Sequence, residues 1–79
     1  MNLVIRSPLS YTQAEQVFDR LRTHDKVLTA FMVVDDKESI MEREIFLALK
    51  QPCDITPDVS SIFSAEKLDS GFHVGSFGN

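Results

Sequence analysis

Residues 39–50 read Ser-Ile-Met-Glu-Arg-Glu-Ile-Phe-Leu-Ala-Leu-Lys, and this stretch decides the fold because it fits two secondary structures. As a helix, it would begin with a capping box made by Ser39 and Glu42. An apolar stripe follows at helical spacing, formed by Met41, Ile45, Ala48 and Leu49. Local propensity also favours a helix, since good helix formers dominate and no Gly marks a turn before the segment. We therefore predict a helix over residues 39–50.

The alternative is a strand over residues 40–49 that forms a hairpin with the apolar segment before it. One face of that strand would consist of Met41, Arg43, Ile45, Leu47 and Leu49. Four of these five residues are apolar, and Arg43 is the exception. The weakness of the helix assignment is that it leaves Phe46 and Leu47 near the rim of the apolar stripe. The strand assignment would give the β-α-β-β-α-β order of a ferredoxin-like fold.

The preceding segment, residues 27–34, is the most apolar run of the chain and reads Val-Leu-Thr-Ala-Phe-Met-Val-Val. Neither of its two faces is polar, so the run predicts a central strand that is buried on both sides. A helix before it would cover one face. The other face would be covered by residues 39–63 if they are helical, or by a second subunit or partner if residues 39–50 form a strand in an open-faced sheet.

The remaining segments complete a small α+β domain that spans residues 1–79. A first strand over residues 2–6 is ended by Pro8. A helix over residues 12–24 would start at a capping box of Thr12 and Glu15 and bury a face made of Ala14, Val17, Phe18 and Leu21. Thr56-Pro57 opens a third helix over residues 57–67, and residues 72–77 form an edge strand. We expect a sheet of two or three strands, with helices over residues 39–50 and 57–67 on the face opposite the first helix.

Composition limits the function classes. The chain has 79 residues, of which 43% are hydrophobic and 25% charged, with a net charge of −4. Most of that negative charge follows residue 34, which disfavours direct binding to nucleic acid or to an anionic membrane. The longest apolar run is too short to cross a bilayer, and the N-terminus lacks the features of a secretory signal. Because Cys53 is the only cysteine, we expect a cytoplasmic protein.

Candidate catalytic and metal-binding residues form no pattern typical of an enzyme. Asp35 and Asp36 follow an apolar strand, and the sequence Val33-Val34-Asp35-Asp36 resembles the acidic strand end of response-regulator receiver domains, which implies Mg²⁺ bound by carboxylates. The resemblance covers about five residues, and the chain is too short for that doubly wound fold. Cys53, His24 and His73 lack the spacing of a nucleophile and base or of a zinc site. We expect neither catalysis nor a metal or other cofactor.

Binding residues are easier to nominate. An acidic group consists of Asp35, Asp36, Glu38, Glu42 and Glu44, and it would dock on a basic surface. The glycine-spaced tail carries Phe72 and Phe77, which would contact another chain through strand addition. We therefore predict a protein-binding accessory or inhibitor module that occupies a basic surface of its target, of the kind that phages and other mobile elements encode. The alternative is a small-molecule- or metal-binding domain, regulatory or enzymatic, that uses Asp35 and Asp36 and forms a homodimer.

Overall fold

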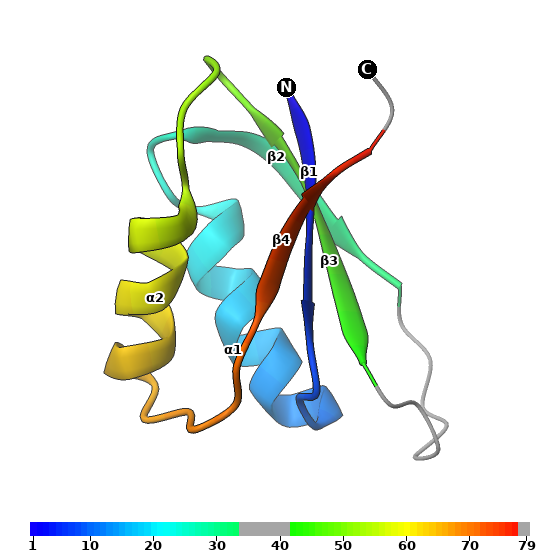
Figure 1. Cartoon of the computed structure of the whole chain (residues 1–79), viewed down its shortest axis with the longest axis vertical. Helices are drawn as coiled ribbons and strands as arrows, with labels where there is room; N and C mark the ends of the chain where they lie inside the picture. The colour runs from blue at the N-terminus through cyan, green and yellow to red at the C-terminus, as the bar shows by residue number, and fades with distance from the viewer. Residues whose placement is uncertain (34–41, 78–79) are drawn as a thin grey trace.

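A computed structural model describes residues 1–33 and 42–77 of the chain and shows a small α+β architecture (Figure 1). The elements in chain order are β1 (Asn2–Ser7), α1 (Tyr11–Arg22), β2 (Val27–Met32), β3 (Arg43–Leu49), α2 (Thr56–Ala65) and β4 (His73–Ser76). The four described strands form one antiparallel sheet in the order β2-β3-β1-β4. The sheet thus has one strand more than the two or three expected.

The prediction of a helix over residues 39–50 is wrong for the described part of that segment. Residues 43–49 form β3, which lies between β1 and β2 and pairs with both. Its burial alternates strictly along the strand, with Arg43, Ile45, Leu47 and Leu49 buried. Hydrogen bonding to two neighbouring strands and burial of this face outweigh the small helical preference of the residues, because propensity is a weak prior. Residues 39–41 lie outside the described residues.

The prediction that residues 27–34 form a central strand is also wrong. Strand β2 ends at Met32, and it lies at the edge of the sheet, because β3 separates it from β1. Val27 is buried, and Ala30 and Met32 pack against the core, but Leu28, Phe31 and Val33 are exposed. The segment is apolar on both faces, yet only one face contacts the hydrophobic core. Residue 34 lies outside the described residues.

Both helices cover the same face of the sheet (Figure 1). One hydrophobic cluster joins Leu3 and Ile5 of β1 and Ile45, Leu47 and Leu49 of β3 to the buried sides of α1 and α2. Helix α1 contributes Ala14, Val17 and Leu21, and α2 contributes Val59, Ile62 and Phe63. Among residues 1–33 and 42–77, no helix or strand packs on the opposite face. The expected placement of helices on both faces is therefore wrong.

The helix ends show how local chemistry positions these elements. Helix α1 begins at Tyr11, one residue before the expected start, because Ser10 rather than Thr12 is its N-cap. The Ser10 hydroxyl accepts from the Gln13 N–H at 3.2 Å, and the Gln13 side chain accepts from the Ser10 N–H at 3.0 Å. Helix α2 ends through Lys67, which has a φ of 57°, and the Leu68 N–H donates to the Phe63 carbonyl at 3.0 Å.

Candidate functional site

The candidate site is the face of the sheet that the helices leave uncovered. Successive strand residues point to opposite faces, so the residues between the core positions belong to this one. Val4 of β1 lies opposite Phe46 of β3 and Gly75 of β4 in the strand register, and Phe46 in turn lies opposite Phe31 of β2. The centre of the uncovered face is therefore apolar across four strands.

Three phenylalanines form a row across this face, which we call the aromatic ladder: Phe31, Phe46 and Phe77. The rings of Phe31 and Phe46 stack with centroids 4.8 Å apart and an interplanar angle of 11°. Phe77 meets Phe46 edge to face at a centroid distance of 5.0 Å. Such pairs add about 0.5–1.5 kcal/mol beyond the burial of their surface. The ladder is thus a fixed apolar platform, although the Phe31 side chain remains 56% exposed.

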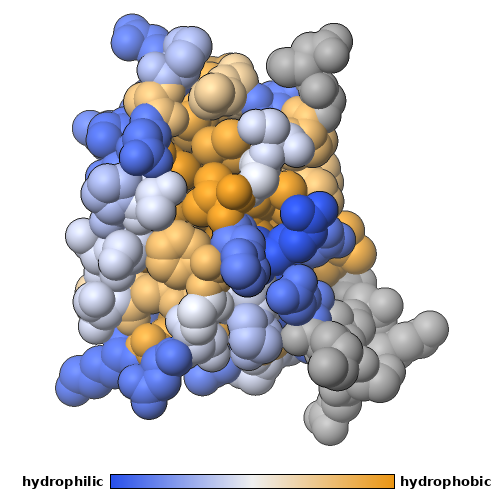
Figure 2. Space-filling model, viewed as in Figure 1, coloured by the Kyte–Doolittle hydropathy of each residue, from blue (hydrophilic) through white to orange (hydrophobic). Residues whose placement is uncertain are grey.

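A shallow hollow of about 190 Å³ lies along the ladder. Residues from all four described strands or their ends line it: Asn2, Thr29, Phe31, Phe46, Leu47, Ala48 and Phe77. In Figure 2, which has the view of Figure 1, the hydrophobic residues on the right-hand side lie on the side of the sheet away from the helices. Surface of this kind, apolar in the middle and bordered by polar groups, is typical of a contact site for another protein.

Charged groups lie toward one end of the same face. Arg6 of β1 lies opposite Glu44 of β3 in the register, and the Arg6 Nε donates to the Glu44 Oε2 at 2.8 Å. Both side chains are more than 40% exposed, so this pair contributes less than about 1 kcal/mol to stability. His73 lies on the other side of Arg6. The uncovered face thus combines an apolar centre with a paired, accessible charge at its border.

Only some of the residues that the sequence suggests for partner binding lie within the described part of the chain. Asp35, Asp36 and Glu38 lie outside the described residues. The alternative in which Asp35 and Asp36 bind a metal or small molecule therefore also concerns residues outside the described part of the chain. Glu42 is exposed directly before β3, and Glu44 pairs with Arg6 on the uncovered face.

The two phenylalanines of the tail lie on different sides of the sheet. Phe72 packs toward the helices, where its ring lies 4.9 Å from that of Phe63. Phe77 belongs to the aromatic ladder on the opposite face. Phe31 and Phe46 were not nominated. In the alternative strand over residues 40–49, side chains alternate between two faces, which puts Phe46 on the face opposite Ile45 and Leu47; this alternation is the signal for Phe46.

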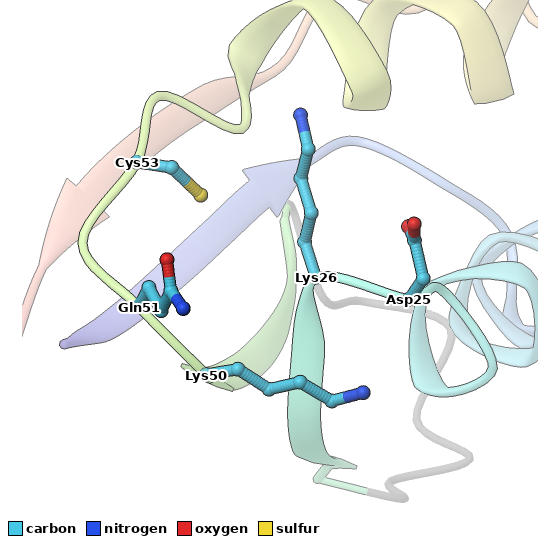
Figure 3. A pocket seen from close by; sticks show the side chains of 5 residues that line it. All are labelled: Asp25, Lys26, Lys50, Gln51 and Cys53. Atoms are coloured by element: carbon cyan, nitrogen blue, oxygen red, sulfur yellow. The ribbon is translucent and has the colours of Figure 1, made fainter.

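A second hollow, of about 260 Å³, lies between the α1–β2 connection and the β3–α2 connection (Figure 3). It is lined by Asp25, Lys26, Lys50, Gln51 and Cys53. The Lys26 side chain extends toward α2, and its Nζ contacts the Asp58 Oδ2 at 2.9 Å. The hydrogen bond from Lys26 lowers the pKa of Asp58, and the same bond raises the pKa of Lys26. The contact therefore ties the start of β2 to the first turn of α2.

His24 completes this ion-pair network. Its Nε2 lies 3.4 Å from the Asp58 Oδ1, and its Nδ1 accepts from the Lys26 backbone N–H at 3.1 Å. Both ring nitrogens thus have structural partners. In residues 1–33 and 42–77, no group of three or more His, Cys, Asp or Glu side chains is placed to hold a metal ion. Because the contacts of His24 and Lys26 with Asp58 join the segment before β2 to α2, we assign this network a structural role.

The sequence matches no family model and no curated protein. Within the described part of the chain, neither helix has the length and apolar character needed to span a membrane.

Proposed function

We propose that this protein is a small binding module, an accessory or inhibitor that acts by occupying the surface of a target protein through the uncovered face of its sheet. The observation that carries the proposal is the aromatic ladder, which is held by stacking yet lies where none of the described helices covers it. Aromatic side chains supply a large contact area with little loss of conformational entropy, and they often dominate binding energies. The target would present an apolar patch to this ladder.

The negative charge of this chain indicates which kind of target surface it would bind. The chain carries a net charge of −4, and five carboxylates cluster between residues 35 and 44. Four of these carboxylates lie between β2 and β3, the two strands that carry Phe31 and Phe46, and Glu44 lies at the start of β3. A target with basic residues around its apolar patch would meet complementary charge, which increases the association rate and selects the partner. The same charge disfavours nucleic acid and anionic membranes as partners.

We further propose that the architecture is the ferredoxin-like one. The element order β-α-β-β-α-β and the strand order β2-β3-β1-β4 support this assignment. In such a fold both helices occupy one face of the sheet, so the other face is free to bind. The proposed fold and the proposed function therefore depend on the same arrangement of strands.

The test is affinity capture from the native host with purified chain, followed by measurement of the affinity for each captured protein. Phe31→Ser removes the most exposed ring of the ladder, and D36K/E38K/E42K reverses three acidic groups. We expect each variant to weaken binding on the order of tenfold, as for an interface hot spot. Only the charge-reversal variant should also reduce the salt dependence of the association rate.

A matched control has the same change of net charge at a different place. E15K/D19K/D69K reverses three acidic residues that are exposed outside the sheet face, on α1 and before β4. This control should bind its captured protein as the parent does. Unchanged affinity in both Phe31→Ser and D36K/E38K/E42K would contradict the proposal, provided that circular dichroism shows both variants folded.

A further inference from the structure

The outer edge of β2 carries backbone groups that β3 does not use. Strand β2 is the last strand of the sheet on its side, so its outward N–H and C=O groups have no strand neighbour among the described residues. Such an edge is a template for another extended chain, and natural proteins usually protect it with Lys, Pro or inward-pointing charges. Residues 27–33 contain no charged residue and no proline. The edge is therefore open to pairing.

The side chains at this edge are unusually apolar for a surface. Five large hydrophobic side chains are exposed in the described structure, and three of them lie on or next to β2: Leu28 (67%), Phe31 (56%) and Val33 (58%). Leu28 is the extra residue of an irregularity in the pairing with β3, between Val27 and Thr29. The segment after it, residues 29–32, follows β3 in regular register. A regular, uncharged, apolar edge favours pairing with a strand of the same character.

We infer that β2 pairs antiparallel with β2 of a second copy of this chain, about a two-fold axis through Phe31. In this register Thr29 lies opposite Val33 of the second copy, and Ala30 lies opposite Met32. Thr29 and Val33 are β-branched side chains of similar size, and Ala30 leaves room for the larger Met32. Phe31 lies opposite Phe31 of the second copy, at the 4.5–5.5 Å Cβ separation typical of directly opposed strand residues. Because no charge lies in the seam, the net charge of −4 per chain places no like charges against each other there.

The pairing extends both features of the uncovered face. Two sheets of four described strands would become one continuous sheet, and the stacked pair of Phe46 and Phe31 would continue into Phe31 and Phe46 of the second copy. A closed two-fold interface of this kind gives the outward N–H and C=O groups of β2 hydrogen-bond partners in both copies and creates no new unpaired strand edge. The inference concerns self-association and goes beyond the proposed binding of a target protein.

A charge-swap experiment tests both the seam and its register. In T29K/V33K, each lysine lies opposite a lysine of the second copy, whereas in T29K/V33E each lysine lies opposite a glutamate. Sedimentation equilibrium of the parent should give twice the 8.9 kDa mass of one chain, with dissociation on dilution. T29K/V33K should sediment as a monomer, and T29K/V33E should recover the dimer. An equimolar mixture of T29K/V33K and T29E/V33E, each monomeric alone, should also form dimers.

Three outcomes would overturn the inference: a monomeric parent at every concentration, a dimer that persists in T29K/V33K, or equal dissociation of T29K/V33K and T29K/V33E. Thermal melting of each variant separates loss of the dimer from loss of the fold, and the two lysine-bearing variants differ at residue 33 alone. Because Thr29 lines the hollow of the candidate site, capture of a target protein is measured with the single variant V33K, whose lysine lies in the seam but outside that hollow. A monomeric V33K that still captures the target would leave the proposed function intact, so the two proposals fail separately.

Discussion

The ring of Phe31 at the edge of the sheet stacks on the ring of Phe46 in the next strand, with centroids 4.8 Å apart. The two residues are direct neighbours in the strand register, but they differ in exposure. Phe31 is 56% exposed, whereas Phe46 is half-buried between Phe31 and Phe77. The pair therefore combines a structural residue with an accessible one.

This difference predicts unequal effects on stability. Phe46→Ala removes both ring contacts and should lower the free energy of unfolding by about 2 kcal/mol, less than for a fully buried Phe. Phe31→Ala removes one contact of an exposed ring and should cost no more than about 1 kcal/mol. Urea denaturation of the two variants gives both values. Equal losses would show that the ladder does not depend on Phe46 as its central member.

The N-terminus of α1 offers a comparison between two neighbouring hydroxyls. Ser10 is the N-cap and bonds the Gln13 N–H, while Thr12 is exposed within the first turn. We expect Ser10→Ala to destabilise the fold by about 1 kcal/mol and Thr12→Ala to change it by less than about 0.5 kcal/mol. Thermal melts of both variants test this. A larger loss for Thr12→Ala would restore the capping box predicted from the sequence.

Ser7 connects the end of β1 to the segment before β4. It is 2% exposed, and its hydroxyl donates to the Gly71 carbonyl at 2.7 Å. Ser7→Ala would leave that carbonyl without this donor, and we expect a loss of about 1 kcal/mol. Relative to the parent, amide hydrogen exchange in the variant should accelerate more in β4 than in α1, because among the described strands β4 pairs with β1 alone. Uniform acceleration across the chain would indicate a global effect instead.

The network around Asp58 predicts a pH dependence. The pKa of Asp58 is lowered in the folded state, chiefly by the hydrogen bond from Lys26, so its contribution to stability is present above the unfolded pKa of about 3.8. The contribution is lost as the pH falls through the lower folded value. Asp58→Asn should lower the free energy of unfolding by less than about 1 kcal/mol at neutral pH, since solvent screens the pair.

The same variant should lose less stability than the parent when the pH falls below about 4, because it lacks one carboxylate that must be protonated. Denaturant titrations from neutral to acidic pH measure both effects. Parallel stability curves for the parent and Asp58→Asn would contradict the assigned role of this ion pair.

Lys67 ends α2 in the left-handed region, with a φ of 57°. Glycine adopts this conformation without the steric cost of a Cβ, and it is the usual residue at such a helix end. Lys67→Gly should therefore stabilise the fold by about 0.5–1 kcal/mol, whereas Lys67→Val should destabilise it. A stability loss in Lys67→Gly would mean that the lysine side chain makes a contact worth more than the backbone cost.

Several elements could be predicted from local sequence because their signals lie within a few residues. Pro8 ends β1, the spacing of Ala14, Val17 and Leu21 indicates α1, and Thr56-Pro57 opens α2. The strand over residues 72–77 was placed within one residue at each end. The candidate site was predicted less well. The sequence indicated Phe77 as a contact for another chain, but it placed Phe31 in a strand expected to be buried on both faces.

The sequence by itself determined an α+β domain with a first strand, an amphipathic helix and an apolar second strand, because side-chain periodicity and capping act over one or two turns. Only the tertiary structure decided that residues 43–49 are a strand, because their advantage comes from pairing with β1 and β2, residues that lie far away in the sequence. Because β3 lies between β1 and β2, β2 is at the edge of the sheet and Phe31 is exposed. Local periodicity cannot report which of two apolar faces finds a neighbour, and that choice created the candidate binding surface.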